Sequence, residues 1–220
     1  MAPKSPQQLK EIREEKKAVI MDSALLLFAG RGFHATTIGD IAEGADISKG
    51  LMYNYFDGKE DLLAEIIRTS LAGISRSLDA DIPYISHDRP LSPDEFGLIV
   101  RRLGRLVREK STFLKLLFQV FMQPLVREQL SGIFREGSPA GREGEESGET
   151  VFLSRLMKSI RGYFERKRAL PGDEHDPGMS TEMFLLTMKG FALTYVFMDP
   201  ENFDSDSFEK AVDEIIDLYK

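Results

Sequence analysis

Hydroxyl, ammonium and phenol groups gather in one short stretch of this sequence, between residues 37 and 59. These groups donate hydrogen bonds or carry positive charge, as phosphate contacts require, and two of the hydroxyls stand where a helix is expected to begin. Asn54 adds an amide that can pair with adenine, although a simple solvated position is the alternative, and Leu51 can contact a thymine methyl group. The residues predicted to contact DNA are Thr37, Ser48, Lys49, Gly50, Leu51, Tyr53, Asn54, Tyr55 and Lys59.

Three helices must position these groups. Residues 9–29 contain no Gly or Pro and carry apolar residues at helical spacing, which predicts a long helix ended by Gly30-Arg31-Gly32. A short helix is expected after Thr37, and a third, of about two turns, from Lys49 to Phe56. The side chains expected to form a core among the three are Phe28, Phe33, Ile38, Ile41, Ala42, Ile47, Met52 and Phe56. Two short helices joined by a tight turn indicate a helix-turn-helix, whose second helix enters the major groove of DNA.

The same stretch resembles a known family. The residues that carry the likeness are Thr36-Thr37-Ile38-x-x-Ile41-Ala42 and Ile47-Ser48-Lys49-Gly50-x-x-Tyr53-x-Tyr55-Phe56-x-x-Lys59-Glu60-x-Leu62. They are similar to the signature of the tetracycline-repressor (TetR) family of bacterial regulators, over about Ile20 to Leu63. The resemblance implies a DNA-binding domain at residues 1–58 and a helical ligand-binding and dimerisation domain at 59–220. It also implies a homodimer on a pseudo-palindromic operator and repression relieved by a small molecule.

Three positions depart from that signature. Asp46 stands where the turn usually holds Gly, and because Asp tolerates the left-handed conformation better than most residues, the turn is expected to form. Gly39 replaces a residue that often contacts a base, and Gly inside a helix costs about 1 kcal/mol relative to Ala. Leu51 stands where a hydroxyl is common. The sequence of the operator therefore cannot be derived from these residues.

The rest of the chain also predicts helices, so the expected fold is all-α. Apolar residues recur at helical spacing in segments 59–78, 93–109, 112–122, 125–134, 151–169, 179–198 and 205–219. A proline-containing loop is expected at 79–93. Residues 136–148 hold four Gly and almost nothing apolar, which predicts a mobile linker.

Large apolar side chains in this second part exceed what a minimal bundle needs, which favours a pocket for a hydrophobic or aromatic ligand, with ordinary core packing as the alternative. The predicted pocket residues are Phe113, Leu117, Phe118, Phe121, Met122, Phe152, Met157, Phe164, Phe191 and Tyr195. The last two helices are expected to form a four-helix dimer interface, with Gly190 allowing close approach. The predicted interface residues are Phe184, Met188, Phe208, Val212, Ile215, Ile216 and Tyr219.

Composition argues against several other classes of protein. The 220 residues include no Cys, which excludes thiolate nucleophiles and Cys-ligated metals and fits a cytoplasmic setting. Three His residues stand at no metal-ligand spacing, so no metal, cofactor or catalytic activity is predicted. The net charge of −7 argues against a protein covered with positive charge, so any DNA-binding surface is expected to be local. The alternative function is a constitutive helix-turn-helix protein whose helical part recruits a protein partner.

Overall fold

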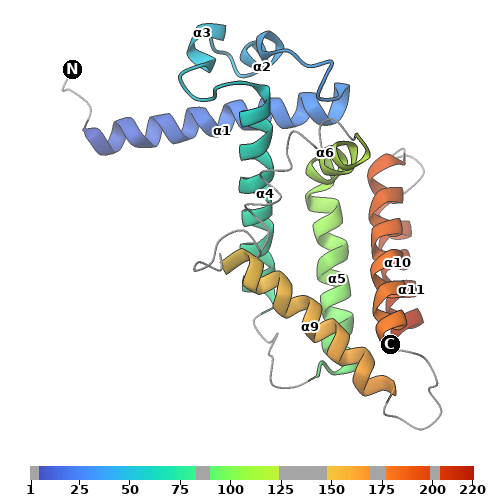
Figure 1. Ribbon diagram of the computed structural model, residues 1–220. Helices are drawn as coiled ribbons and strands as arrows, with labels where there is room; N and C mark the ends of the chain where they lie inside the picture. The colour runs from blue at the N-terminus through green and yellow to red at the C-terminus, as the bar shows by residue number, and fades with distance from the viewer. Residues whose placement is uncertain (1–4, 83–89, 124–147, 169–176, 199–203) are drawn as a thin grey trace. The chain divides into compact units, whose positions relative to one another are not determined.

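The structure is a computed structural model that describes residues 5–82, 90–123, 148–168, 177–198 and 204–220 (Figure 1). Helices α1 (Pro6–Arg31), α2 (Ile38–Gly44), α3 (Lys49–Met52), α4 (Lys59–Asp81), α5 (Pro93–Glu109), α6 (Ser111–Met122), α9 (Gly148–Arg168), α10 (Pro177–Phe197) and α11 (Ser205–Tyr219) account for most of these residues, and the described ranges contain no strand. The prediction of an all-α fold is confirmed. The helix expected at 125–134 and the linker expected at 136–148, apart from Gly148, lie outside the described residues.

Contacts within the chain divide it into two compact units. We call residues 1–70 with 115–134 the head, and residues 71–114 with 135–220 the body. Helix α4 begins in the head and ends in the body. The predicted division between residues 58 and 59 stays a prediction. No helix of the described ranges is long and apolar enough to cross a membrane.

In the head, α2 and α3 lie on one side of α1, and α4 crosses it (Figure 1). Ser5 and Gln8 form a capping box that starts α1, with Pro6 in the first turn, so this helix begins three residues earlier than expected. It ends at Gly32, whose φ of 89° only glycine adopts readily. Six of the eight predicted core residues are buried, and Ile38 and Ile47 are half-buried. The predicted core of the helix-turn-helix is therefore largely confirmed.

The turn between α2 and α3 depends on Asp46. Its φ is 52°, and no other described residue apart from glycine has a positive φ. The expectation that Asp46 takes the left-handed conformation of a turn glycine is confirmed.

Helix α3 is shorter than the sequence predicts, ending at Met52 rather than Phe56. Beyond it, the backbone N–H of Asn54 donates to Leu51 O and that of Tyr55 to Met52 O, each at 3.0 Å. Because these bonds span three residues instead of four, the chain continues as a tighter turn. This turn leaves both Met52 and Phe56 buried in the head.

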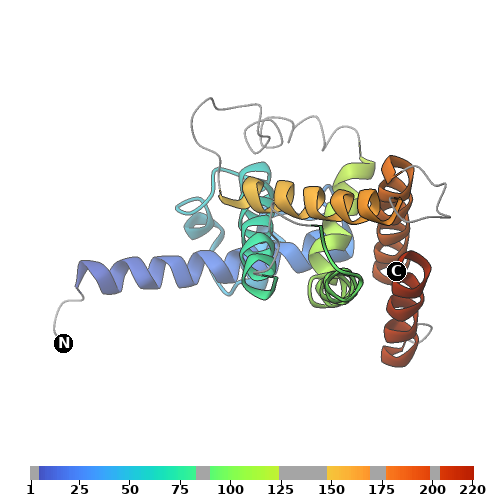
Figure 2. The same cartoon turned by 90° about the horizontal axis from the view of Figure 1, so that it is seen from below.

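In the body, α5 packs against α9, α10 and α11; Figure 2 views α5 nearly end-on, with α9 running past it. Its core is an aromatic cluster in which the rings of Phe96 and Tyr163 stack with centroids 4.2 Å apart. Gly104 lets α5 approach α11 closely, since a Cβ atom there would come within 2.8 Å of Val212 Cγ2. Close approach of this kind brings the apolar faces of both helices into contact.

The end of α4 is joined to α5 by a buried arginine. Arg102 is 5% exposed, and its Nε donates to the carboxylate of Asp81. Its two terminal nitrogens bond Ser77 Oγ at 2.6 Å and Glu109 Oε2 at 3.4 Å. Every nitrogen of this buried guanidinium therefore has a partner, as burial of a charge requires.

Candidate nucleic-acid interface

The α3 segment, defined as residues 48–56, has a buried side and an exposed side. Met52 and Phe56 are buried, whereas Leu51 is 37% exposed and Tyr53 52% exposed. Lys49, together with Ser48, Gly50 and Asn54, is also exposed, and Tyr55 is half-buried. Ser48 Oγ accepts the backbone N–H of Leu51 at 3.1 Å and so starts the helix as expected. The segment thus offers a cation, a phenol and an apolar side chain to a partner outside the protein.

Thr37 starts α2, but its hydroxyl is already engaged. Its Oγ1 donates to Asp40 Oδ2 at 2.6 Å and accepts the Asp40 N–H at 3.1 Å, while the Thr37 N–H donates to the same carboxylate at 2.7 Å. These hydrogen bonds hold the pKa of Asp40 below its usual value. A phosphate at Thr37 would therefore have to approach a carboxylate that already occupies this helix end.

Lys59 is half-buried, and its ammonium group bonds within the head. Its Nζ donates to Thr36 O at 2.8 Å and to Phe33 O at 2.9 Å, and it lies 4.6 Å from the centroid of the Phe33 ring. The ammonium group therefore fixes the connection between α1 and α2 to the start of α4. The DNA contact predicted for Lys59 stays a prediction that competes with this structural role.

Arg13 and Lys17 of α1 contact the α3 segment. The sequence did not predict these two contacts. Arg13 donates to Asn54 O at 3.1 Å, and its guanidinium lies 5.4 Å from the centroid of the Tyr55 ring. Lys17, one turn further along, lies 5.8 Å from the ring of Phe56 and pairs with Glu65 of α4 at 2.6 Å. In the sequence, the only sign of these contacts is the spacing of four residues between Arg13 and Lys17, which places both cations on one face of the helix.

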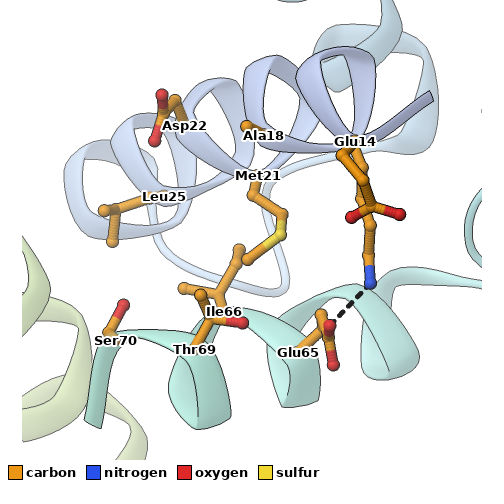
Figure 3. A pocket seen from close by; sticks show the side chains of 10 residues that line it. Glu14, Ala18, Met21, Asp22, Leu25, Glu65, Ile66, Thr69 and Ser70 are labelled. Atoms are coloured by element: carbon orange, nitrogen blue, oxygen red, sulfur yellow. Dashed lines mark hydrogen bonds and ion pairs between the residues drawn. The ribbon is translucent and has the colours of Figure 1, made fainter. Parts of the chain in front are cut away.

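Next to this contact lies a groove of about 270 Å³ between α1 and α4 (Figure 3). Met21 points from α1 towards Ile66 of α4, and Lys17 and Glu65, which also line the groove, form an ion pair. Carboxylates of Glu14 and Asp22 stand along the groove. Apolar contact and one ion pair thus hold α4 against α1 within the head.

The described parts of the chain contain no group of three His, Cys, Asp or Glu residues placed to hold a metal ion. His34 is exposed beside Phe33. His87 and His175 lie outside the described residues.

The sequence of the head also matches a known family. The profile of the family described as bacterial regulatory proteins, tetR family, matches residues 20–66, which include α2, α3 and the start of α4. The N-terminal domain of this chain belongs to the TetR family.

Sequence relatives of the TetR domain agree with this assignment. The chain is 36% identical over 82 residues to the uncharacterised HTH-type transcriptional regulator YfiR of Bacillus subtilis, a match that covers 37% of this chain and 40% of YfiR. It is 45% identical over 53 residues to the HTH-type transcriptional repressor KstR2 of Rhodococcus jostii, covering 24% of this chain and 26% of KstR2. The matched region is thus less than half the length of either relative.

Solved structures share the fold along nearly the whole chain. The fatty acid degradation regulator FadR of Bacillus halodurans aligns with a TM-score of 0.61 and 16% identity, over 99% of this chain and 96% of FadR. AibR, solved in complex with isovaleryl coenzyme A and operator DNA, aligns with a TM-score of 0.59 and 16% identity, over 92% of this chain and 97% of AibR. At this identity the alignments establish the fold alone.

The ten residues predicted for a ligand pocket are divided between the two units, and the pocket stays a prediction. Leu117, Phe118, Phe121 and Met122 belong to the head, whereas the other six belong to the body. In the body, Phe164 lies in the aromatic cluster with Phe96, and Phe113 is buried. The rings of Phe191 and Tyr195 both contact Phe208, while Met157 is exposed. The side chain of Phe152 lies outside the described residues.

Five of the seven residues predicted for the dimer interface are buried within the protomer: Phe184, Phe208, Val212, Ile215 and Ile216. Met188 is half-buried, and Tyr219 packs its ring against Phe184 and bonds Thr187 through its hydroxyl at 2.6 Å. The dimer interface predicted for these residues stays a prediction.

Proposed function

We propose that the protein is a DNA-binding transcriptional regulator of the TetR family. The observation that carries the proposal is the α3 segment, which buries Met52 and Phe56 while Lys49, Leu51 and Tyr53 face outwards. A short helix anchored in this way can enter a major groove, with Lys49 and Tyr53 contacting phosphates and Leu51 meeting base edges. The relatives YfiR and KstR2 are named as transcriptional regulators, and KstR2 as a repressor, which supports this function and favours repression.

The test is a fluorescence-anisotropy titration of the protein with the intergenic DNA beside its own gene, and with a scrambled duplex of equal length. We expect saturable binding that prefers the natural sequence and weakens steeply with salt. Equal binding of both duplexes at every salt concentration would contradict a sequence-specific regulator for that DNA.

We further propose that the regulator is a homodimer formed through α10. Exposed residues recur on one face of this helix at intervals of three and four: Met183, Leu186, Gly190, Leu193 and Phe197. Such spacing makes a continuous stripe along a helix, and apolar stripes left exposed on a protomer are typical of interfaces. A two-fold axis through the stripe would present two α3 segments to successive half-sites of a pseudo-palindrome, about 34 Å apart.

Light scattering with a single substitution tests the dimer. Leu186 is 60% exposed, so Leu186→Glu leaves the protomer core intact while placing charge on the stripe. We expect this variant to be monomeric at micromolar concentration. Met157→Glu, which places the same charge at an exposed apolar residue of α9, is the control and should remain dimeric. A dimer that survives Leu186→Glu would place the interface elsewhere.

A small molecule bound in the body is proposed to release the operator through α4. The first half of this helix is held to the head by Lys59 and by the pair of Lys17 and Glu65, and its last turn is held to α5 by Arg102. A ligand that moved α5 would therefore move α4 and change the spacing of the two α3 segments. AibR binds operator DNA and isovaleryl coenzyme A, which gives the proposal a precedent in the same fold.

The release mechanism can be tested by measuring both affinities, because the effector must lower the affinity for DNA by the same factor as DNA lowers the affinity for the effector. If a ligand that binds the body left operator affinity unchanged, the alternative would apply: constitutive DNA binding, with the body recruiting a protein partner.

A further inference from the structure

The body holds a second arginine whose surroundings contrast with those of Arg102. The Nε atom of Arg155, on α9, is sealed from solvent and has no hydrogen-bond partner. The same is true of Ser159 Oγ, and Ser159 is only 5% exposed. Arg102 is buried with every nitrogen bonded, so the fold can satisfy a buried guanidinium. At Arg155, which is half-buried as a residue, the Nε atom is left without such a partner.

Arg155 and Ser159 are four residues apart on one helix. At this spacing two side chains are neighbours on the same face, about 5–6 Å apart at Cβ. Leu156 and Ile160, which follow each of them, are buried. The two unsatisfied donors therefore border the apolar inner face of α9.

A buried donor without a partner destabilises a protein, and such groups are rare unless something else satisfies them. A guanidinium donates in a fork that fits a carboxylate or phosphate, and a hydroxyl adds one further donor. We propose that Arg155 and Ser159 anchor the anionic group of the effector, whose remainder is apolar. The inference rests on the proposed function, since it names the chemical class of the ligand that the body binds.

This site changes the expectation drawn from the sequence. The excess of large apolar side chains in the second part of the sequence predicts a hydrophobic or aromatic ligand. The structure shows instead a half-buried Arg155 with a sealed, unpartnered Nε atom, so the effector is an amphiphile with a negatively charged end.

Matched eight-carbon probes test the charge of the ligand. Octanoate, octyl phosphate, octanol and octylamine share their chain and differ in their end group, and octanoyl-coenzyme A tests whether the anion is carried by a larger phosphate group. We expect at least one of the three anions to raise the melting temperature, with octanol weaker and octylamine without effect. Stabilisation by octanol or octylamine equal to that by every anion would overturn the proposal.

Substitution of Arg155 tests the site itself. Arg155→Met should weaken binding of the stabilising anion at least about tenfold, since a charge-assisted pair is lost. Arg161→Met, at an exposed arginine of the same helix, is the control and should bind that anion as the natural protein does. Unchanged anion binding by Arg155→Met would overturn the proposal.

A second measurement needs no ligand. If Arg155 lacks a partner in the free protein, Arg155→Met should raise the melting temperature of the unliganded protein, while Arg161→Met leaves it unchanged. A lower melting temperature for Arg155→Met would mean that the chain supplies its own partner for Arg155, and would overturn the proposal. Operator binding by the same samples distinguishes failure of the anionic-effector proposal from failure of the proposed DNA-binding function. A protein that binds its operator but no anion refutes only the anionic effector, whereas one that binds anions but no DNA refutes the proposed function.

Discussion

Lys59 offers a direct test between two roles that the same ammonium group could play. The sequence predicts a phosphate contact, whereas the structure shows Nζ bonded to Thr36 O and Phe33 O. Lys59→Met removes the charge and keeps most of the aliphatic side chain. The two roles predict opposite results for stability and for the salt dependence of DNA binding.

The structural role predicts a measurable loss of stability. Hydrogen bonds to charged groups contribute about 1.5–3 kcal/mol each, and a cation over an aromatic ring about 0.5–1 kcal/mol at exposed positions. Because Lys59 is half-buried, solvent can partly replace these contacts, and we expect a total loss of about 2–3 kcal/mol. For a chain of this size the melting temperature would fall by about 4–12 °C.

Thermal unfolding followed by circular dichroism, with anisotropy titrations at several salt concentrations, separates the two roles. Each phosphate contact contributes about 0.9 to the slope of log K against log salt, so losing one contact per protomer of a dimer would reduce the slope by about 1.8. We expect Lys59→Met to lower stability and leave the slope unchanged. The exposed Lys49 is the matched control: Lys49→Met should reduce the slope and leave stability unchanged. A normal melting temperature with a reduced slope for Lys59→Met would refute the structural role.

Three further predictions concern the head. Asp46→Gly should raise stability by about 0.5–1 kcal/mol, because glycine adopts a φ of 52° without steric cost; urea unfolding measures this, and a loss would contradict the strain argument. Gly44→Ala should destabilise, since its Cβ would clash with Ser23 Oγ, and Ser23→Ala in the same chain should recover part of the loss in the same assay. Because the pKa of Asp40 is lowered in the folded state, its contribution is present above the ordinary Asp pKa and is lost as pH falls through the lowered value. Asp40→Asn should therefore flatten the acid limb of stability below about pH 4, and an unchanged limb would exclude the Thr37 contact as its cause.

Local patterns predicted most of the head because its determinants are close in sequence. The spacing of Phe28, Ile41 and Met52 marks the buried side of successive helices, and all three are buried. Asp46 follows from the few residue types that tolerate a left-handed turn. The predicted length of α3 was wrong. The tighter turn beyond Met52 keeps Phe56 in the core, and this is a tertiary contact that helical periodicity in the sequence does not reveal.

Contacts between distant residues were not predictable in this way. Lys59 bonds residues 23 and 26 positions away, and Arg13 bonds Asn54 across 41 positions. From sequence alone, a lysine or arginine beside a DNA-binding motif is predicted to contact phosphate, because the direction of its side chain is unknown. Only the fold distinguishes a cation that faces DNA from one that holds the surface in place.

Helix α10 shows the same limit for apolar residues. It is apolar nearly all round, so periodicity gives no outward face from which dimer residues such as Phe184 and Met188 could be selected. Phe184 is fully buried within the protomer. The exposed stripe through Leu186 and Leu193 became visible only when the inner face of the helix had been assigned to the body.

The distribution of polar contacts along α4 suggests how a body made largely of apolar contacts could transmit a signal. Apolar packing tolerates small sliding, whereas hydrogen bonds and ion pairs specify one geometry. In α4 such contacts occur near both ends: Lys59 and Glu65 in the head, and Ser77 and Asp81 on Arg102 in the body. A helix fixed at both ends passes a displacement on instead of absorbing it. Asp81→Ala should therefore weaken the coupling between effector and operator by more than it weakens either binding reaction alone, and equal losses of coupling and binding would argue against α4 as the connection.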